Sequence, residues 1–212
     1  MTKKSNIFMN FIYSFSIFIA TSLLTTTAGA MLKSKVYGYI AGYFFAILIL
    51  YIIYRKKIKF DIKNFKEDFK KYGLNVFIVS AILIASEVGL ALLFRKLGLD
   101  SANQNYAIDL INDNKIMLLY CILLSPIFEE LCFRLPYHYS KNNKLLTYIV
   151  YSVIFGLTHL MGITDLLSLI YIIPYLLLAF GVGYGFYKSD NILMSTIVHI
   201  INNSLAIMLI LL

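Results

Sequence analysis

Charged residues are scarce in this chain. Of its 212 residues only 14% are Asp, Glu, Lys or Arg, whereas 60% are hydrophobic and the mean hydropathy is +0.78. A soluble globular protein carries about a quarter charged residues. The composition therefore excludes a soluble enzyme and a nucleic-acid-binding domain as the main interpretation.

Cysteine and proline are also rare, with two and three residues respectively. Cys121 and Cys132 lie in one apolar segment, and a separation of about 16 Å along a helix prevents a disulfide between them. The chain is therefore not a disulfide scaffold, and both thiols are expected to pack as small apolar side chains. Because the sequence contains no repeat and no Pro/Gly-rich linker, residues 1–212 are predicted to form a single transmembrane domain.

Long apolar segments make up most of the chain. Crossing about 30 Å of hydrocarbon takes about 20 helical residues, and five uncharged segments have roughly this length or more. Two further segments are equally apolar apart from a few charges. The seven candidate spans are 7–32, 36–54, 74–94, 116–136, 145–164, 166–187 and 191–212. We therefore predict an all-α polytopic membrane protein with about seven transmembrane helices.

Basic residues gather between the second and third predicted spans. The segment 55–71 holds eight basic and three acidic residues, and such clusters favour the cytoplasmic side and contact with anionic lipid. We expect 55–73 to be a basic cytoplasmic amphipathic loop that forms a helix on the membrane surface. Alternation of the spans then places 13 basic residues inside and five outside, with the N-terminus in the cytoplasm and the C-terminus outside.

The first apolar segment allows a second interpretation. Lys3 and Lys4, an apolar run and the small residues Ala28-Gly29-Ala30 are also typical of a secretory signal peptide. The uncharged run of 7–32 is long for such a peptide, which favours a span. Cleavage would leave six spans and would remove none of the motifs described next.

Three charged residues lie inside the fourth predicted span. Placing a charge within the bilayer costs free energy, so charged residues in spans usually have a function. Glu130 and Arg134 are four residues apart, so they share a helical face and are expected to form an ion pair. Glu129 points about 100° away and lacks such a partner, which leaves it free to accept a proton. A structural network of all three residues is the alternative. Pro126 is expected to kink the helix just before the acids.

Polar residues also occur inside two later spans. His159 follows Phe155 by four residues in the fifth span, and His199 and Asn203 share one helical face in the seventh. Each of these residues alone could be a structural hydrogen-bonding group. Together with the glutamates they are more simply explained by one polar site within the membrane.

Such a site could hydrolyse an amide bond. Glu129 could deprotonate a water held with His159, while His199 and Asn203 donate hydrogen bonds to the developing oxyanion. The sequence contains neither a Gly-x-Ser-x-Gly nor a His-Glu-x-x-His motif. Glu129, His159 and His199 could instead ligate a divalent metal such as zinc. No cofactor is favoured, and zinc remains the alternative.

Three motifs follow one another on successive spans: Glu-Glu-x-x-x-Arg at 129–134, Phe-x-x-x-His at 155–159 and His-x-x-x-Asn at 199–203. In this order they resemble the CAAX protease and bacteriocin-processing family (CPBP, or Abi) of intramembrane peptidases, which are related to type II CAAX prenyl endopeptidase. The resemblance covers about 116–212, the motif-bearing half of the chain.

The resemblance implies an all-α membrane fold with a cavity that opens to the cytoplasmic side. It also implies catalytic residues on the fourth, fifth and seventh helices, with supporting residues beside them. The catalytic residues would be Glu129 as the water-activating base, His159 as its partner, and His199 with Asn203 as the oxyanion-stabilising pair. The supporting residues would be Glu130, Arg134 and Phe155.

The predicted function is that of an intramembrane endopeptidase acting on a membrane-associated peptide or small protein, such as a pheromone or bacteriocin precursor. Its expected partners are membrane lipid and this substrate, and not nucleic acid. The abundance of Lys, Ile, Asn and Tyr is typical of a low-GC Gram-positive bacterium, in whose plasma membrane the protein would reside. The alternatives are a non-catalytic scaffold or immunity protein and, more weakly supported, a proton-coupled transporter that uses Glu87, Glu129 and Glu130.

Overall fold

Helices make up all of the regular structure in the part of the chain that the computed structural model describes, residues 7–99, 101–139, 143–160 and 167–211. The α-helices are α1 (Ile7–Met31), α2 (Lys35–Lys96), α3 (Ala102–Asp113), α4 (Met117–Leu119), α5 (Ser125–Phe133), α6 (Lys144–Thr158), α7 (Ile172–Ser189) and α8 (Ile192–Leu211). A π-helical segment, Tyr120–Leu124, joins α4 to α5, and 3-10 turns span Leu135–Tyr139 and Leu167–Tyr171. The predicted all-α class is confirmed.

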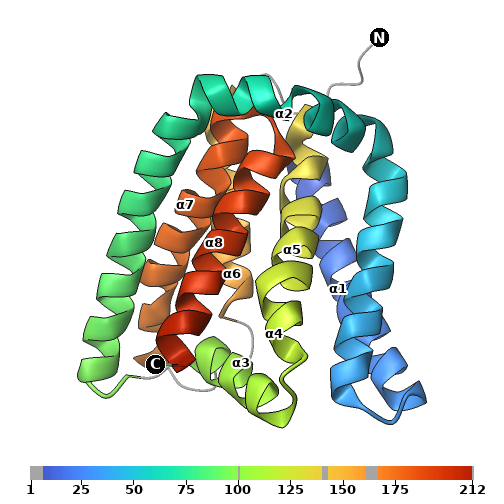
Figure 1. Ribbon diagram of the computed structural model, residues 1–212, viewed down its shortest axis with the longest axis vertical. Helices are drawn as coiled ribbons and strands as arrows, with labels where there is room; N and C mark the ends of the chain where they lie inside the picture. The colour runs from blue at the N-terminus through green and yellow to red at the C-terminus, as the bar shows by residue number, and fades with distance from the viewer. Residues whose placement is uncertain (1–6, 100, 140–142, 161–166, 212) are drawn as a thin grey trace.

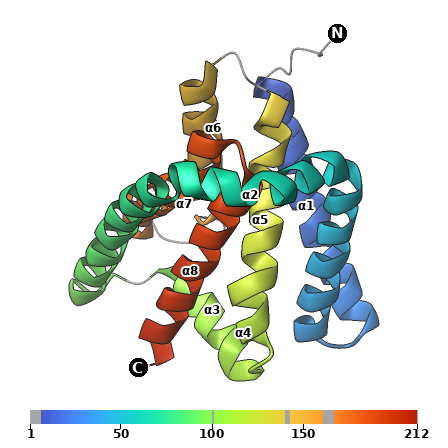
Figure 2. The ribbon, with the colours of Figure 1, turned by 45° about the horizontal axis from the view of Figure 1, so that its top comes forward.

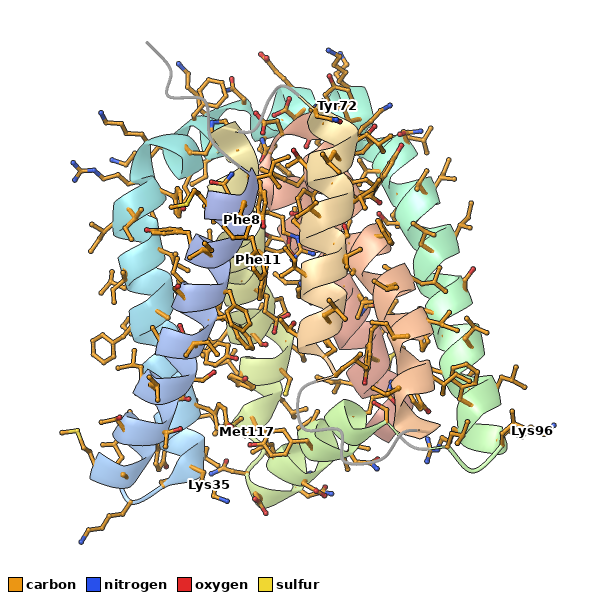
Figure 3. All side chains as sticks on the ribbon, turned by 180° about the vertical axis from the view of Figure 1, so that it is seen from behind. Phe8, Phe11, Lys35, Tyr72, Lys96 and Met117 are labelled. Atoms are coloured by element: carbon orange, nitrogen blue, oxygen red, sulfur yellow. The ribbon has the colours of Figure 1, made fainter. Side chains whose placement is uncertain are left out.

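The second and third predicted spans, with the basic segment between them, form one helix of 62 residues. α2 rises along one side of the bundle, crosses over it and descends on the other side (Figures 1 and 2). Its ends, Lys35 and Lys96, lie at the same end of the molecule as Met117, whereas Tyr72 lies at the opposite end (Figure 3). We call residues 55–73 the arch, and the flanking parts the first and second legs of α2.

The apolar segments form upright helices, as expected of a protein that spans a membrane. Three helices, namely α1, α2 and Leu169–Ser189, are long and apolar enough to cross a membrane by themselves, and α6 and α8 are shorter apolar helices. Apolar side chains on α2, such as Phe45, Ile52 and Phe77, are about half exposed or more. Such surfaces are stable in lipid rather than in water. The chain is therefore an all-α polytopic membrane protein.

Two elements differ from the sequence-based expectation. The segment 95–115, expected to be a loop, contains α3, whose first turn is capped by Ser101 accepting from the Gln104 N–H at 3.1 Å. α3 lies across the end of the bundle opposite the arch (Figure 1). The fifth span, expected over 145–164, begins one residue earlier at Lys144 and ends as a helix at Thr158. Its predicted end falls outside the described residues.

Buried polar contacts hold the arch on the turn between α7 and α8. Lys57 Nζ lies 2.5 Å from Asp61 Oδ1 and also donates to the Asp190 carbonyl. Asp61 in turn accepts from the Ile192 N–H at 3.0 Å and so caps the first turn of α8. Burial raises the pKa of the Asp61 carboxyl, while the hydrogen bonds from Lys57 and Ile192 oppose this rise. The arch is thus attached to the helix that carries His199.

Glycines allow neighbouring helices to approach closely. A Cβ atom at Gly185 of α7 would lie 2.8 Å from the backbone carbonyl carbon of Met194 in α8. One at Gly38 of α2 would lie 2.5 Å from the Cα of Gly29 in α1. Real Cβ atoms do not approach backbone atoms this closely, so both contacts require glycine.

We expect Gly185→Ala to lower the free energy of unfolding by about 1–3 kcal/mol, because α7 and α8 must separate to admit the methyl group. The measurement is thermal loss of helical circular dichroism in detergent. Gly89→Ala is the matched control, since a Cβ there meets nothing within 4 Å, and alanine is the better helix former. Equal melting temperatures for the two variants would contradict the packing described.

Candidate active site

The predicted catalytic side chains line one cavity of about 460 Å³. Glu129, His159, His199 and Asn203 all border it. Further lining residues come from α1, from both legs of α2 and from α3, so the cavity extends from Glu129 toward the end of the bundle opposite the arch. The topology therefore brings three motifs that are distant in sequence to a single polar site.

Glu130 is the buried acid that joins two parts of the site. Its Oε2 lies 3.3 Å from Arg134 Nε, and both side chains are fully buried, so the ion pair expected from their spacing is present. Its other oxygen, Oε1, lies 3.0 Å from His199 Nδ1. Glu130 therefore fixes the orientation of the His199 ring as well as balancing the charge of Arg134.

Glu129 lies at the cavity wall, with its side chain 15% exposed. Its Oε2 lies 3.6 Å from His199 Nε2, and Ser125 donates a hydrogen bond to its Oε1. His199 thus stands between the two glutamates, one at each ring nitrogen. The Glu130–Arg134 spacing predicts no local partner for Glu129, but Ser125 lies four residues before it, a spacing that places two side chains on one helical face.

Phe155 is a fully buried aromatic residue that contacts three residues of the site. Its ring centroid lies 4.2 Å from the Arg134 guanidinium carbon, 4.7 Å from the ring of His159 and 5.5 Å from that of His199. The guanidinium nitrogens Nη1 and Nη2 of Arg134 make no hydrogen bond within the described residues. The face of the Phe155 ring therefore supplies part of the stabilisation that hydrogen bonds would otherwise give to this buried cation.

His159 follows the last residue of α6 and is held by the backbone of its own helix. Its Nδ1–H donates to the Phe155 carbonyl at 3.0 Å, which leaves Nε2 as an acceptor in the neutral ring. His159 and Glu129 share the cavity without a direct hydrogen bond among the described contacts. This arrangement suits two groups that bind the same small molecule between them.

Asn203 stabilises an irregular stretch of backbone opposite α8. In the π-helical segment the Ser125 N–H bonds to the Tyr120 carbonyl, five residues earlier. In that register residue 126 would bond to the Cys121 carbonyl, but a proline has no N–H. Asn203 Nδ2 donates to the Cys121 carbonyl at 2.9 Å instead. One of its two amide hydrogens is therefore committed to the backbone, and the second is left for a ligand.

Glu129, His159 and His199, the residues that would hold a metal ion, all border the cavity. Among the described residues no group of three or more His, Cys, Asp or Glu side chains is placed to hold one. Glu129 and His199 lie together, and His159 keeps its Nε2 available to a ligand because its Nδ1–H donates to the Phe155 carbonyl.

The family model described as type II CAAX prenyl endopeptidase Rce1-like matches residues 112–205. This part of the chain is similar to that family, and we call residues 112–205 the Rce1-like segment. The Rce1-like segment contains all the motif residues of the site, and the predicted resemblance is confirmed.

A curated relative of this chain is the UPF0177 protein YxdF of Lactococcus lactis subsp. lactis (strain IL1403). It is 35% identical over 77 residues, which are 36% of this chain and 40% of that protein. The match thus spans less than half of the length of the relative. No solved structure matches the chain significantly.

The two neighbouring acids are expected to differ in their effect on stability. Glu130→Gln leaves the Arg134 cation buried without its counter-charge and should cost about 3–5 kcal/mol of unfolding free energy. Glu129→Gln keeps the shape and leaves no cation unpaired, so it should cost less than about 1 kcal/mol. Thermal melting of both variants in one detergent measures the difference. A similar loss in both would contradict the division between a structural and a cavity-facing acid.

The hydrogen bond from Asn203 to the Cys121 carbonyl predicts that substitutions of Asn203 and Pro126 are not additive in their effects on stability. Asn203→Leu leaves the Cys121 carbonyl without a donor and should cost about 1 kcal/mol. In a Pro126→Ala background residue 126 regains its N–H and can bond to the same carbonyl, so Asn203→Leu should cost markedly less. A double-mutant cycle by thermal melting measures this coupling, and strict additivity would refute it.

Proposed function

We propose that this protein is an intramembrane endopeptidase, which hydrolyses a peptide bond of a membrane-associated peptide or small protein through a glutamate-activated water. The observation that carries the proposal is the position of Glu129. It faces a cavity within the bundle and lies beside His199, whose other ring nitrogen is held by Glu130. The Rce1-like match supports a protease-type activity.

Water activation follows from the groups that face the cavity. A water bound between Glu129 and His159 would donate one hydrogen bond to the carboxylate and one to the His159 Nε2. Glu129 would take the proton as the water oxygen bonds to the carbonyl carbon of the substrate. Ser125, which donates to Glu129 Oε1, would leave Oε2 as the oxygen that accepts this proton.

The remaining donors would serve the tetrahedral intermediate. The second N–H of the Asn203 amide and, in the protonated ring, the Nε2–H of His199 would donate to the oxyanion. Glu129 would then return its proton to the leaving nitrogen as the peptide C–N bond breaks, which restores the starting carboxylate. Glu130, Arg134 and Phe155 would hold the His199 ring in place throughout.

The proposal also covers the orientation of the chain in the membrane. The arch holds eight basic residues. It contains Tyr72 and lies at the end of the molecule opposite Lys35 and Lys96 (Figure 3). The positive-inside rule favours the arch end as cytoplasmic. The cavity then extends from Glu129 toward the outer side, whereas the family resemblance implies a cytoplasmic opening. Labelling of single cysteines introduced at the arch and in α3 shows which end of the cavity faces the cytoplasm.

The proposed substrate class is a peptide pheromone or bacteriocin precursor in the plasma membrane of a Gram-positive cell. A cavity within the helical bundle suits a substrate that arrives with its apolar part in the bilayer. A non-catalytic scaffold or immunity protein remains the second candidate for a chain with these helices.

Glu129→Gln should abolish cleavage of a panel of membrane-associated precursor peptides by purified protein, with a loss of at least about 100-fold, while its melting temperature stays near that of the wild type. Cleavage by the wild type should persist in a chelator. Glu67→Gln, an exposed acid of the arch, is the matched control and should cleave normally. Equal cleavage by Glu129→Gln and wild type would refute the mechanism, and sensitivity to chelator would point to a metal. A folded wild type that cleaves nothing would favour the scaffold.

A further inference from the structure

Glu87 is a buried acid that the proposed mechanism does not use. It lies on the second leg of α2, outside the Rce1-like segment and outside the three motifs. The residue is 8% exposed and lines the same cavity as Glu129.

Glu87 differs from the other buried acids of the described residues because it has no partner there. Asp61 is paired with Lys57, and Glu130 is paired with Arg134 and His199. Glu87 has neither a hydrogen bond nor an ion pair with any described residue. An ionisable group in a membrane protein that serves only structure is normally paired, so its free carboxylate in the cavity indicates a ligand.

The cavity as a whole is suited to a positive charge. Among the residues that the structure describes, its lining contains the carboxylates of Glu87 and Glu129 but no Lys or Arg. Aromatic rings, whose faces attract cations, also border the cavity. They belong to Tyr39, Tyr43, Tyr106, Tyr120 and Tyr175.

Glu87 shares the cavity with Tyr175 and His159. The Tyr175 ring lies 5.2 Å from that of His159. Tyr175 is itself hydrogen-bonded to Ser101 at the start of α3. A group held by Glu87 would therefore be close to the water that Glu129 activates.

We propose that Glu87 binds a lysine or arginine side chain of the substrate, next to the bond that Glu129 hydrolyses. This inference deepens the proposed function and rests on it for the position of the scissile bond. The cation would neutralise a carboxylate that is otherwise unpaired, so the cavity would select peptides with a basic residue near the cleavage site.

The test uses the full-length protein in phosphatidylcholine vesicles, whose uncharged surface does not itself attract basic peptides. The probes are short fluorescent leucine–alanine peptides in which one lysine is moved along the sequence, each compared with the same peptide carrying glutamine at that position. Binding is measured by anisotropy with the Glu129→Gln variant, and cleavage with the wild type. At one lysine position we expect the lysine peptide to bind roughly tenfold more tightly than the glutamine peptide. A well-formed ion pair accounts for a difference of about this size.

Glu87→Gln, introduced into both the binding and the cleavage protein, should reduce this ratio to about one, and Glu87→Asp should keep most of it. Glu67→Gln, which removes a negative charge from the exposed face of the arch, should leave the ratio unchanged. A lysine preference that persists in a folded Glu87→Gln variant, or equal binding of all lysine and glutamine peptides by the protein with Glu87 intact, would overturn the proposal. Lysine-selective binding that depends on Glu87 but without cleavage by the wild type would support the cation site and refute the peptidase.

Discussion

The buried contact between Glu130, Arg134 and His199 is the interaction on which the rest of the site depends. Arg134 and Glu130 balance each other's charge where water cannot, and the second oxygen of Glu130 determines how the His199 ring is turned. Because Phe155 covers the guanidinium and also contacts both histidine rings, the charge pair and the ring positions form one unit. Of the two adjacent acids, Glu130 is therefore part of this buried unit, whereas Glu129 faces the cavity.

The same site also depends on a departure from regular helix geometry. The π-helical turn before Pro126 moves the backbone by one residue, and the unpaired Cys121 carbonyl is satisfied from α8 by Asn203. This contact attaches the fourth span to the seventh near the level of the glutamates. A π-helical turn at a functional site is a recurrent solution, since it reorients side chains without ending the helix.

Hydropathy and motif spacing predicted the all-α membrane class, the seven apolar segments and the Glu130–Arg134 pair, because these depend on local composition and on the period of a helix. The amphipathic pattern of 55–73 predicted a surface helix there, but no local pattern shows that this helix continues into the spans on both sides. The sequence also does not predict that Glu87 lines the same cavity as the motif residues. This position depends on which helices pack together, and no local pattern in 74–94 encodes that. The role of the Cys121 carbonyl as the partner of Asn203 required the actual backbone register.

The continuity of α2 has a mechanical consequence for the cavity. Tyr39 and Tyr43 on its first leg and Glu87 on its second leg stand on opposite sides of the same opening, yet they belong to one uninterrupted helix. The arch, which Lys57 and Asp61 fasten to the start of α8, therefore joins these two walls. Spreading the walls to admit a bulky chain would bend this helix or loosen that attachment.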